Sequence, residues 1–339
     1  MIPQREYFDK DIANSDNTSG YYIIEENDFV YNPRKSADAP YGPISRYKYA
    51  EAGIVSPLYL CFRAKKEINP SFFEWYFRSS AWHRYVYMSG DSGARHDRVS
   101  IKDDTFFAMP INLPSAHEQE HIASFLERID QRIEKQRALV ESLKKYKRGL
   151  VKALISGTVA FAGSENKHWE TVSLAEIFTI SAGGDIDRQN SSPTYSTSYP
   201  YPVYANALTN NGLYGYANYF KVEGDSITVS GRGEVGHAIA RHCKYVPIVR
   251  LLSLVPKYED DVDFFAHIIN ATSIYIESTG VPQLTSPQLG AVKVLRPPIW
   301  EQKRISSLLL KIDVKIENEE HLTLYLAKIR SSMLQQLFI

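Results

Sequence analysis

Apolar residues recur in alternating steps of four and three along two long segments, residues 114–157 and 297–339. This heptad spacing is typical of a helix that packs along another helix. Prolines stand at the start of both segments and none follows within them, so the pattern predicts two long helices. The pattern positions are Ile122, Leu126, Ile129, Ile133, Gln136, Val140, Leu143, Lys147, Leu150 and Leu154, then Ile305, Leu309, Ile312, Ile316, Glu319, Thr323, Leu326, Arg330, Met333 and Leu337.

The two segments are copies of one another. Residues 114–155 match residues 297–338 at a constant offset of 183, without a gap, and 14 of the 42 positions are identical. A lone helix of this length cannot bury its apolar stripe, and the economical partner is the other copy. We predict an antiparallel coiled coil within one chain. The alternative is two independent helices, each packed on its own domain or driving homodimerisation.

The segments between the helices alternate short apolar runs with Gly, Pro, Asn and Ser, which is typical of strands joined by polar turns. We predict two α+β domains, residues 1–113 and 158–296, separated by the repeated helices. In the second domain we expect strands at 169–180, 201–204, 226–230, 238–240 and 248–255, and a helix at 262–269. In the first we expect strands at 21–24, 28–31 and 54–62, and a helix at 71–87.

The two domains align when Glu26-Asn27-Asp28 is placed on Glu223-Gly224-Asp225, which indicates a shared fold. The stretch from Trp169 to Asp225 is twice as long as the stretch from Met1 to Asp28. We therefore expect the first domain to lack a leading segment, equivalent to the opening helix and strand of the second.

Composition narrows the class of protein. Lys+Arg and Asp+Glu number 39 each, so the chain has no overall basic field for gripping nucleic acid alone. The two cysteines have no metal-ligand spacing and indicate reduced thiols. No signal segment and no apolar run of 18 residues occurs. We expect a cytoplasmic protein without a membrane partner.

One glycine-rich motif carries candidate chemistry. Residues 231–236 satisfy G-x-G-x-x-G and follow a predicted strand. A dinucleotide site needs a helix directly afterwards, but residues 237–249 contain β-branched residues and Pro247, which favour a strand. We interpret the motif as a hairpin whose backbone approaches another chain or a ligand. We identify no catalytic or metal-ligating constellation, and the pattern favours recognition over catalysis.

The layout resembles the DNA-specificity subunit of type I restriction-modification systems. Pro-x-x-x-Glu-Gln before a long heptad helix, at Pro114 and again at Pro297, is similar to the family's two spacer helices. Residues 155–157 (Ile-Ser-Gly) and the opening Trp169-Glu170 resemble its central region and second target-recognition domain. Residues 22–32 and 54–58 resemble one recurrent type of target-recognition domain. Family members normally open with a complete first domain, from which this chain departs.

The resemblance implies a non-catalytic subunit whose two target-recognition domains each read half of a bipartite double-stranded DNA sequence, with the helices setting the unread gap. It implies two modification (methyltransferase) subunits docked on the helices and restriction (nuclease-translocase) subunits joined to them. No cofactor is expected on this chain. S-adenosylmethionine, ATP and Mg are expected on the partner subunits.

Base edges are read by cationic and amide side chains presented on loops. We predict DNA contacts at Arg34, Lys35, Ser36, Arg46, Arg95 and Arg98 in the first domain, and at Tyr204, Asn206, Ser230, Arg232, Arg241 and Gln283 in the second. For each, an ordinary solvated loop residue is the alternative. For partner docking and helix pairing we name Ile122, Ile129, Ile133, Leu143, Ile305, Ile312, Ile316 and Leu326.

Two other functions stay open from the residues alone. The same domains and helices suit a coiled-coil scaffold or homodimerising interaction protein, and a rearranged locus would leave a silent, half-active remnant of a specificity subunit. A self-sufficient methyltransferase or nuclease is the least favoured, because we identify neither a cofactor loop nor an acidic metal cluster.

Overall fold

The computed structural model describes residues 1, 18–90, 97–156, 169–272 and 283–338. These residues form two compact units. Unit 1 comprises residues 1–138 and 320–339, and unit 2 comprises residues 139–319. The long helices α5 (Ala116–Ile155) and α9 (Ile299–Leu337) each contribute to both units. Both helices agree with the heptad prediction.

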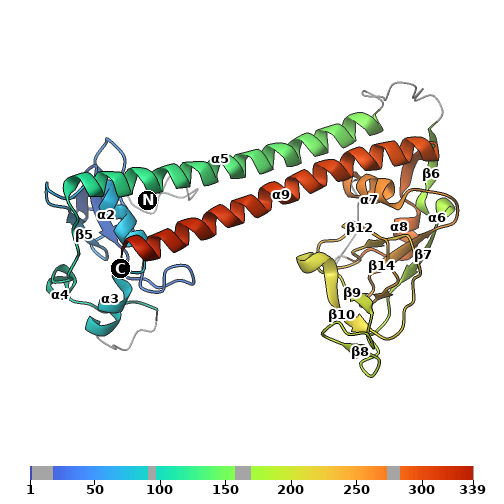
Figure 1. Ribbon diagram of the computed structural model, residues 1–339, viewed down its shortest axis with the longest axis horizontal. Coiled ribbons are helices and arrows are strands. Elements are labelled where there is room, and N and C mark those ends of the chain that lie inside the picture. The colour runs from blue at the N-terminus through green and yellow to red at the C-terminus, as the bar shows by residue number, and fades with distance from the viewer. Residues whose placement is uncertain (2–17, 91–96, 157–168, 273–282, 339) are drawn as a thin grey trace. The chain divides into compact units, whose positions relative to one another are not determined.

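Within unit 1 the β-rich part consists of a three-stranded antiparallel sheet, a two-stranded ribbon and three short helices among the described residues. The sheet has the order β3 (Ile44–Arg46), β2 (Asp28–Tyr31), β5 (Leu60–Arg63), the ribbon pairs β1 (Tyr22–Ile24) with β4 (Gly53–Val55), and the helices are α2 (Pro70–Arg78), α3 (His83–Ser89) and α4 (Asp103–Phe107). Figure 1 shows α2 beside the start of α5 and the end of α9.

The core of unit 1 is aromatic. Phe29 of β2 stacks on Phe62 of β5 with ring centroids 5.5 Å apart, and Phe73 of α2 meets Phe29 edge-on at 5.2 Å. Phe338, the residue directly after α9, closes this core with its ring centroid 5.3 Å from that of Phe72 of α2. Because each buried phenyl ring contributes roughly 1.5–3 kcal/mol, the end of α9 is a substantial part of this domain's stability.

Unit 2 has the same kind of sheet with one more strand. Its order is β12 (Ala238–Arg241), β11 (Ser226–Val229), β14 (Leu252–Pro256), β7 (Phe178–Ala182), and all neighbours are antiparallel. The remaining elements are β6 (Glu170–Ser173), α6 (Leu174–Ile177), β8 (Ser191–Ser192), β9 (Tyr201–Tyr204), the 3₁₀ turn η2 (Thr209–Gly212), β10 (Leu213–Ala217), β13 (Val246–Pro247), α7 (Val262–Ala271), α8 (Ser286–Gly290) and β15 (Lys293–Arg296). A second sheet has the order β13-β9-β10-β8, and β15 pairs with β6.

The predicted alignment of the domains agrees with the backbone. Asn27 before β2 and Gly224 before β11 both have positive φ, 72° and 78°. The central strands β2 and β11 each have antiparallel neighbours on both sides, and β5 and β14 each lead to a helix, α2 or α7. The short helices α4 and α8 begin at Asp103 and Ser286, which are 183 positions apart, as are the copies of the long helix. The ungapped repeat therefore extends upstream of the long helices to α4 and α8.

Four strand and helix predictions need correction. Residues 169–180 are not one strand, because a capping box formed by Ser173 and Glu176 starts the short helix α6 between β6 and β7. Residues 54–62 are not one strand, because a turn in which Tyr59 donates to the Ser56 carbonyl separates β4 from β5. Residues 71–87 are two helices, because Ser79 adopts an extended ψ of 174° and its hydroxyl donates to the Tyr76 carbonyl, competing with the helical ladder. The strand expected at 248–255 begins at Leu252, since Val249 and Arg250 have positive φ.

The heptad positions face the partner helix in both units. On α5 every predicted position is buried or half-buried, and on α9 only Leu337 is exposed. The intramolecular antiparallel pair is therefore confirmed. The polar breaks in the pattern carry ion pairs: Lys147 Nζ lies 2.6 Å from Asp313 Oδ2 in unit 2, and Arg330 Nη1 lies 2.5 Å from Asp130 Oδ1 in unit 1.

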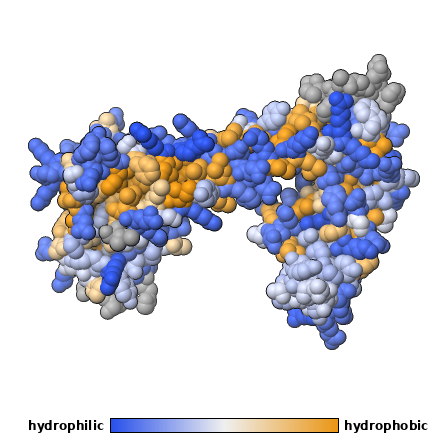
Figure 2. Space-filling model, viewed as in Figure 1, coloured by the Kyte–Doolittle hydropathy of each residue, from blue (hydrophilic) through white to orange (hydrophobic). Residues whose placement is uncertain are grey.

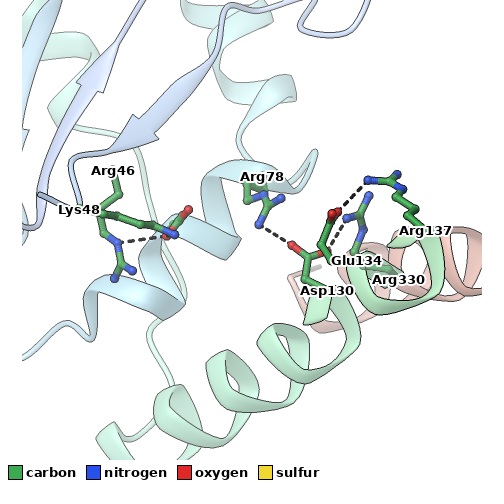
Figure 3. A network of polar contacts seen from close by, with 8 residues as sticks. Arg46, Lys48, Arg78, Asp130, Glu134, Arg137 and Arg330 are labelled. Atoms are coloured by element: carbon green, nitrogen blue, oxygen red, sulfur yellow. Dashed lines mark hydrogen bonds and ion pairs between the residues drawn. The ribbon is translucent and has the colours of Figure 1, made fainter. Parts of the chain in front are cut away.

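These two ion pairs are related by the repeat, since Lys147 corresponds to Arg330 and Asp313 to Asp130 at the offset of 183. The step from Asp130 to Lys147 along α5 therefore equals the step from Asp313 to Arg330 along α9. The helices thus pair in one register in both units. Asp130 also forms an ion pair with Arg78 of α2, whose Nη1 lies 3.0 Å from Asp130 Oδ2 (Figure 3).

The repeated Glu-Gln motif ties each long helix to its own domain. Buried Gln119 accepts a hydrogen bond from the Asn69 backbone at 2.8 Å, and Asn69 is the N-cap of α2. Buried Gln302 accepts one from the Asp261 backbone at 2.9 Å, and Asp261 is the N-cap of α7. Each glutamine also donates to the carbonyl of the proline five residues earlier, at 3.0 and 2.8 Å. The motif thus fixes where each domain attaches.

Candidate nucleic-acid interface

The loops that follow the central strands carry the candidate residues, and they lie at equivalent positions of the two domains. Counting from Asn27 and Gly224, Lys35 after β2 corresponds to Arg232 after β11. In each unit this loop meets the segment that precedes the short helix, α4 or α8. We call the junction of these two loops the reading edge of each unit.

The reading edge of unit 1 brings three predicted residues together. Arg34 and Arg98 face each other in an isolated antiparallel bridge, and the Lys35 amide donates to the Asp97 carbonyl at 2.9 Å. The side chains of Arg34 and Lys35 are exposed and that of Arg98 is half-exposed. Among the described residues none of these three cations has an ion-pair partner. They therefore stay available to a phosphate or a base edge.

The reading edge of unit 2 joins two predicted residues that lie 51 positions apart. Exposed Arg232 directs Nε and Nη2 to the Gln283 Oε1 at 3.2 and 2.9 Å. A Cβ at Gly231 would lie 2.8 Å from the Arg250 carbonyl oxygen, so glycine is required for this close approach. The hairpin part of the interpretation is confirmed, because β12 and no helix follows the glycine motif. The close approach at Gly231 is to another segment of the same chain, where we expected another chain or a ligand.

Arg46 does not lie at the reading edge. It sits on β3 with its side chain 12% exposed, 3.1 Å from the Glu74 carboxylate and with Nη1 3.0 Å from the Ser71 hydroxyl. The Nε contact to Glu74 is an ion pair without aligned hydrogen-bond geometry. Lys48 shares the same carboxylate at 2.8 Å (Figure 3). This arginine joins β3 to α2 and is placed to hold the fold.

Arg241 is also internal. Its side chain is buried, donates to the Thr228 hydroxyl at 2.9 Å and to the Asn211 carbonyl at 2.7 Å, and lies over the Tyr204 ring at 3.7 Å. Burial lowers the pKa of its guanidinium. A guanidinium whose donors and face are already engaged is not free to read a base, so Arg241 and Tyr204 are placed to support β9, β11 and β12.

Three other predicted residues shape the loops. Asn206 accepts from the Gly231 amide at 2.7 Å, Ser230 accepts from the His237 amide at 3.0 Å, and Ser36 accepts from the Ala39 amide at 3.1 Å. Arg95 lies outside the described residues.

Sequence reasoning missed Arg250, an exposed residue whose backbone carbonyl adjoins Gly231. The apolar pattern assigns its segment to a strand, which the positive φ of 60° at Arg250 interrupts.

A metal-binding spacing was also overlooked. Residues 117–121 read His-Glu-Gln-Glu-His, which matches H-E-x-x-H at the start of α5. The His117 and His121 rings lie 4.1 Å apart, but Glu118 caps the helix by accepting from the Ser115 hydroxyl and amide, and these bonds lower its pKa. In the part of the chain that the structure describes, no group of three or more ligands surrounds the motif. The structure thus gives no support to zinc-hydrolase chemistry at this site.

Comparisons with known proteins point to one family. The model of the type I restriction modification DNA specificity domain matches residues 10–144 and 166–326. A putative type I specificity subunit of Mycoplasma pneumoniae is 26% identical over 245 residues, which cover 72% of this chain and 64% of that protein. Another from the same organism is 31% identical over 145 residues, covering 43% of this chain and 42% of that protein. The chain thus spans less than two thirds of the length of these relatives.

Two solved structures share the fold. A chain from a study of assembly and conformational transition in the type I restriction-modification system superposes with a TM-score of 0.63 at 16% identity, covering 93% of this chain and 82% of that chain. The type I S subunit from M. genitalium gives 0.58 at 16% identity, covering 93% and 84%. No helix among the described residues is long and apolar enough to cross a membrane. The shortened first domain stays a prediction, because residues 2–17 lie outside the described ones.

Proposed function

Because the chain belongs to the type I restriction-modification DNA specificity family, we propose that it is the non-catalytic subunit that selects the DNA target of such a complex. Each domain, residues 1–113 and 158–296, reads one half of a bipartite sequence. The helices of residues 114–157 and 297–339 set the unread gap. The observation that carries this proposal is that the same two loops meet in both units and present unpaired or amide-paired cations there.

The readers are the side chains that reach the reading edges. Arg34, Lys35 and Arg98 serve unit 1, and Arg232 with Gln283 serves unit 2. Arginine pairs with guanine and glutamine with adenine through two hydrogen bonds each in the major groove, so an Arg–Gln pair held together suits adjacent base pairs. We assign Arg250 a phosphate contact beside them, because this residue is exposed and its backbone carbonyl adjoins Gly231.

The helix pair docks two modification (methyltransferase) subunits, and restriction (nuclease-translocase) subunits join them. Apolar side chains stay at the surface of both helices, which marks an interaction surface. Figure 2 shows such side chains where the helix pair meets the β-rich part of unit 1. The exposed ones are Phe125, Leu324, Tyr325 and Leu337 in unit 1, and Leu139, Tyr146, Trp300, Leu310 and Val314 in unit 2. S-adenosylmethionine, ATP and Mg belong to the partners, which also supply the basic surface that this neutral chain lacks.

The test is co-expression with a modification subunit encoded beside this chain, followed by long-read mapping of methylated adenines. A bipartite motif with a fixed gap is the expected result. A motif limited to one half-site would show that the first domain does not read DNA. A stable homodimer of the chain that is indifferent to DNA, with no methylation, would favour the coiled-coil scaffold.

A further inference from the structure

Left-handed backbone geometry is concentrated in two turns of unit 2. Among the described residues five other than glycine have positive φ, and four of these lie in the two turns. Asn210 and Asn211, at 51° and 50°, follow β9, and Val249 and Arg250, at 53° and 60°, precede β14. This geometry is unfavourable for a residue with a Cβ, most of all for β-branched valine, and persists where the surrounding structure enforces it, often at functional sites.

One side chain joins both turns to the reading edge of unit 2. The Asn206 carboxamide donates to the Val249 carbonyl at 2.5 Å and accepts from the Gly231 amide at 2.7 Å. Gly231 directly precedes Arg232, which contacts Gln283. The turn after β9 and the turn before β14 therefore lie beside the Arg–Gln pair to which we assign base reading.

Backbone contacts hold the turn after β9 in place. The buried Arg241 guanidinium donates to the Asn211 carbonyl at 2.7 Å, and the Ala205 amide donates to the Gly212 carbonyl at 2.9 Å. Gly212 has a φ of 78°, and a Cβ there would lie 2.7 Å from the Ala205 carbonyl oxygen. These contacts fix the course of the chain and do not use the asparagine side chains.

The side chains of the two turns are open to a ligand. Asn210 and Asn211 are exposed, and their carboxamides have no hydrogen-bond partner in the part of the chain that the structure describes. Val249 is 48% exposed. A β-branched residue that is held in left-handed geometry with its side chain in solvent gains little from core packing, so folding alone does not account for it.

Carboxamides and an apolar group side by side match the major-groove edge of an A·T pair. There adenine offers its N7 as an acceptor and its N6 as a donor, which an asparagine can pair with, and thymine offers its methyl group to an apolar side chain. We propose that Asn210 and Asn211 read adenine and that Val249 contacts a thymine methyl, so that unit 2 requires A·T pairs in its half-site. This inference rests on the proposed function and names residues and bases within it.

The first test uses the complex of the full chain with its modification subunit. The double variant Asn210→Gly/Asn211→Gly and the single variant Val249→Gly remove the side chains, and glycine tolerates positive φ, so their unfolding temperatures should equal or exceed that of the wild type. Mapping of methylated adenines should show at least one A·T position relaxed in one half-site, with the gap and the other half-site unchanged. Asn27→Gly, the same change at a φ of 72° in unit 1, is the matched control and should leave the motif unchanged.

Modified bases then test the atoms. In duplexes of the mapped motif, 7-deazaadenine removes the N7 acceptor and deoxyuridine removes the thymine methyl. By anisotropy the wild-type complex should bind about tenfold more weakly with 7-deazaadenine at the position read, and about fourfold more weakly with deoxyuridine. The double variant should be insensitive to 7-deazaadenine and Val249→Gly insensitive to deoxyuridine, because each protein group and its base atom act together.

An unchanged motif in the double variant, or equal weakening by 7-deazaadenine in that variant and the wild type, would overturn the adenine assignment. Equal weakening by deoxyuridine in Val249→Gly and the wild type would overturn the thymine contact. A lower unfolding temperature with methylation lost at every position would overturn both, because the turns would then only support the fold. If the wild type methylates a bipartite motif, these results leave the proposed function standing, whereas the absence of such a motif in the wild type would contradict the proposed function as well.

Discussion

Two arginines of unit 2 show what residue type alone cannot decide. Arg232 and Arg241 lie nine positions apart, and loop-and-strand reasoning selects both. Arg232 follows β11 in an exposed hairpin turn. Arg241 is the last residue of β12, and its side chain is buried against Thr228 and Tyr204. Alternation cannot fix the facing of a four-residue strand that has half-buried residues at its centre. Composition therefore finds the cations, and only tertiary packing separates the exposed Arg232 from the buried Arg241.

Substituting the two arginines should separate reading from stability. Arg232→Ala should weaken or relax one half-site by roughly 1–3 kcal/mol, because a bidentate base contact is lost. Arg241→Ala should instead lower the free energy of unfolding by roughly 1–3 kcal/mol, since buried groups lose their partner. The measurements are the methylation motif and thermal unfolding. An unchanged motif in Arg232→Ala would remove that residue from the readers.

At the scale of elements, the long helices are predictable and the short strands are only partly so. The heptad pattern fixes α5 and α9 to within two residues of the expected ends, because eight of the ten positions in α5 and seven of the ten in α9 are apolar. The turn between β4 and β5 is closed by one backbone hydrogen bond, and the break at Ser79 depends on one side chain. A single hydrogen bond of this kind leaves little trace in the sequence, so the neighbouring apolar residues predict one continuous strand or helix instead.

Disrupting the helix pair should abolish assembly. Ile133 is 1% exposed in the seam of unit 1, and Ile133→Asp would bury an unpaired carboxylate. We expect a loss of roughly 3–5 kcal/mol in unfolding free energy, and loss of the modification subunit from the complex. Gel filtration with the partner measures this. Arg132→Asp, at the exposed neighbouring position, is the control, and normal assembly of Ile133→Asp would contradict the role of the seam.

The packing of α7 on the helix pair should make unit 2 sensitive to acid. Burial, and next the charge of Lys147, hold the pKa of His267 down at about 4, against the opposing effect of Asp313 at 3.7 Å. His267 is thus neutral in the folded state, and the stability it allows is present above pH 6.5 and lost as pH falls toward 4.

The size of that loss is roughly 3 kcal/mol for a histidine shifted this far. His267→Leu should flatten the dependence of unfolding temperature on pH between 6.5 and 4, whereas the exposed His321→Leu should follow the wild type. Parallel pH profiles for the wild type and His267→Leu would show that another group causes the acid sensitivity.

At the scale of the whole molecule, the balance of cationic and acidic residues should limit how tightly the isolated chain binds DNA. With 39 cationic and 39 acidic residues, the chain has no excess of positive charge, and we expect its phosphate contacts to be confined to the two reading edges. Composition alone indicates that limit, but which surface carries the contacts depends on loops that meet although they lie far apart in the sequence.

The isolated chain should therefore bind DNA weakly, at roughly 10⁻⁴–10⁻⁶ M, and with a shallow dependence on salt. The complex with modification subunits should bind more tightly and with a steeper salt slope, because the partners contribute the additional cations. Anisotropy titrations at three salt concentrations measure both. Tight, salt-sensitive binding by the chain alone would contradict this division of labour.

The ungapped offset of 183 begins at α4 and α8 and runs through the ends of the long helices. Both loops of each reading edge lie upstream of that constant stretch. A genetic crossover within it would exchange one set of readers for another and leave the helix register, the reciprocal ion pairs and the glutamine anchors intact. The architecture thus separates the part of the gene that can be shuffled between lineages from the part that must stay in phase.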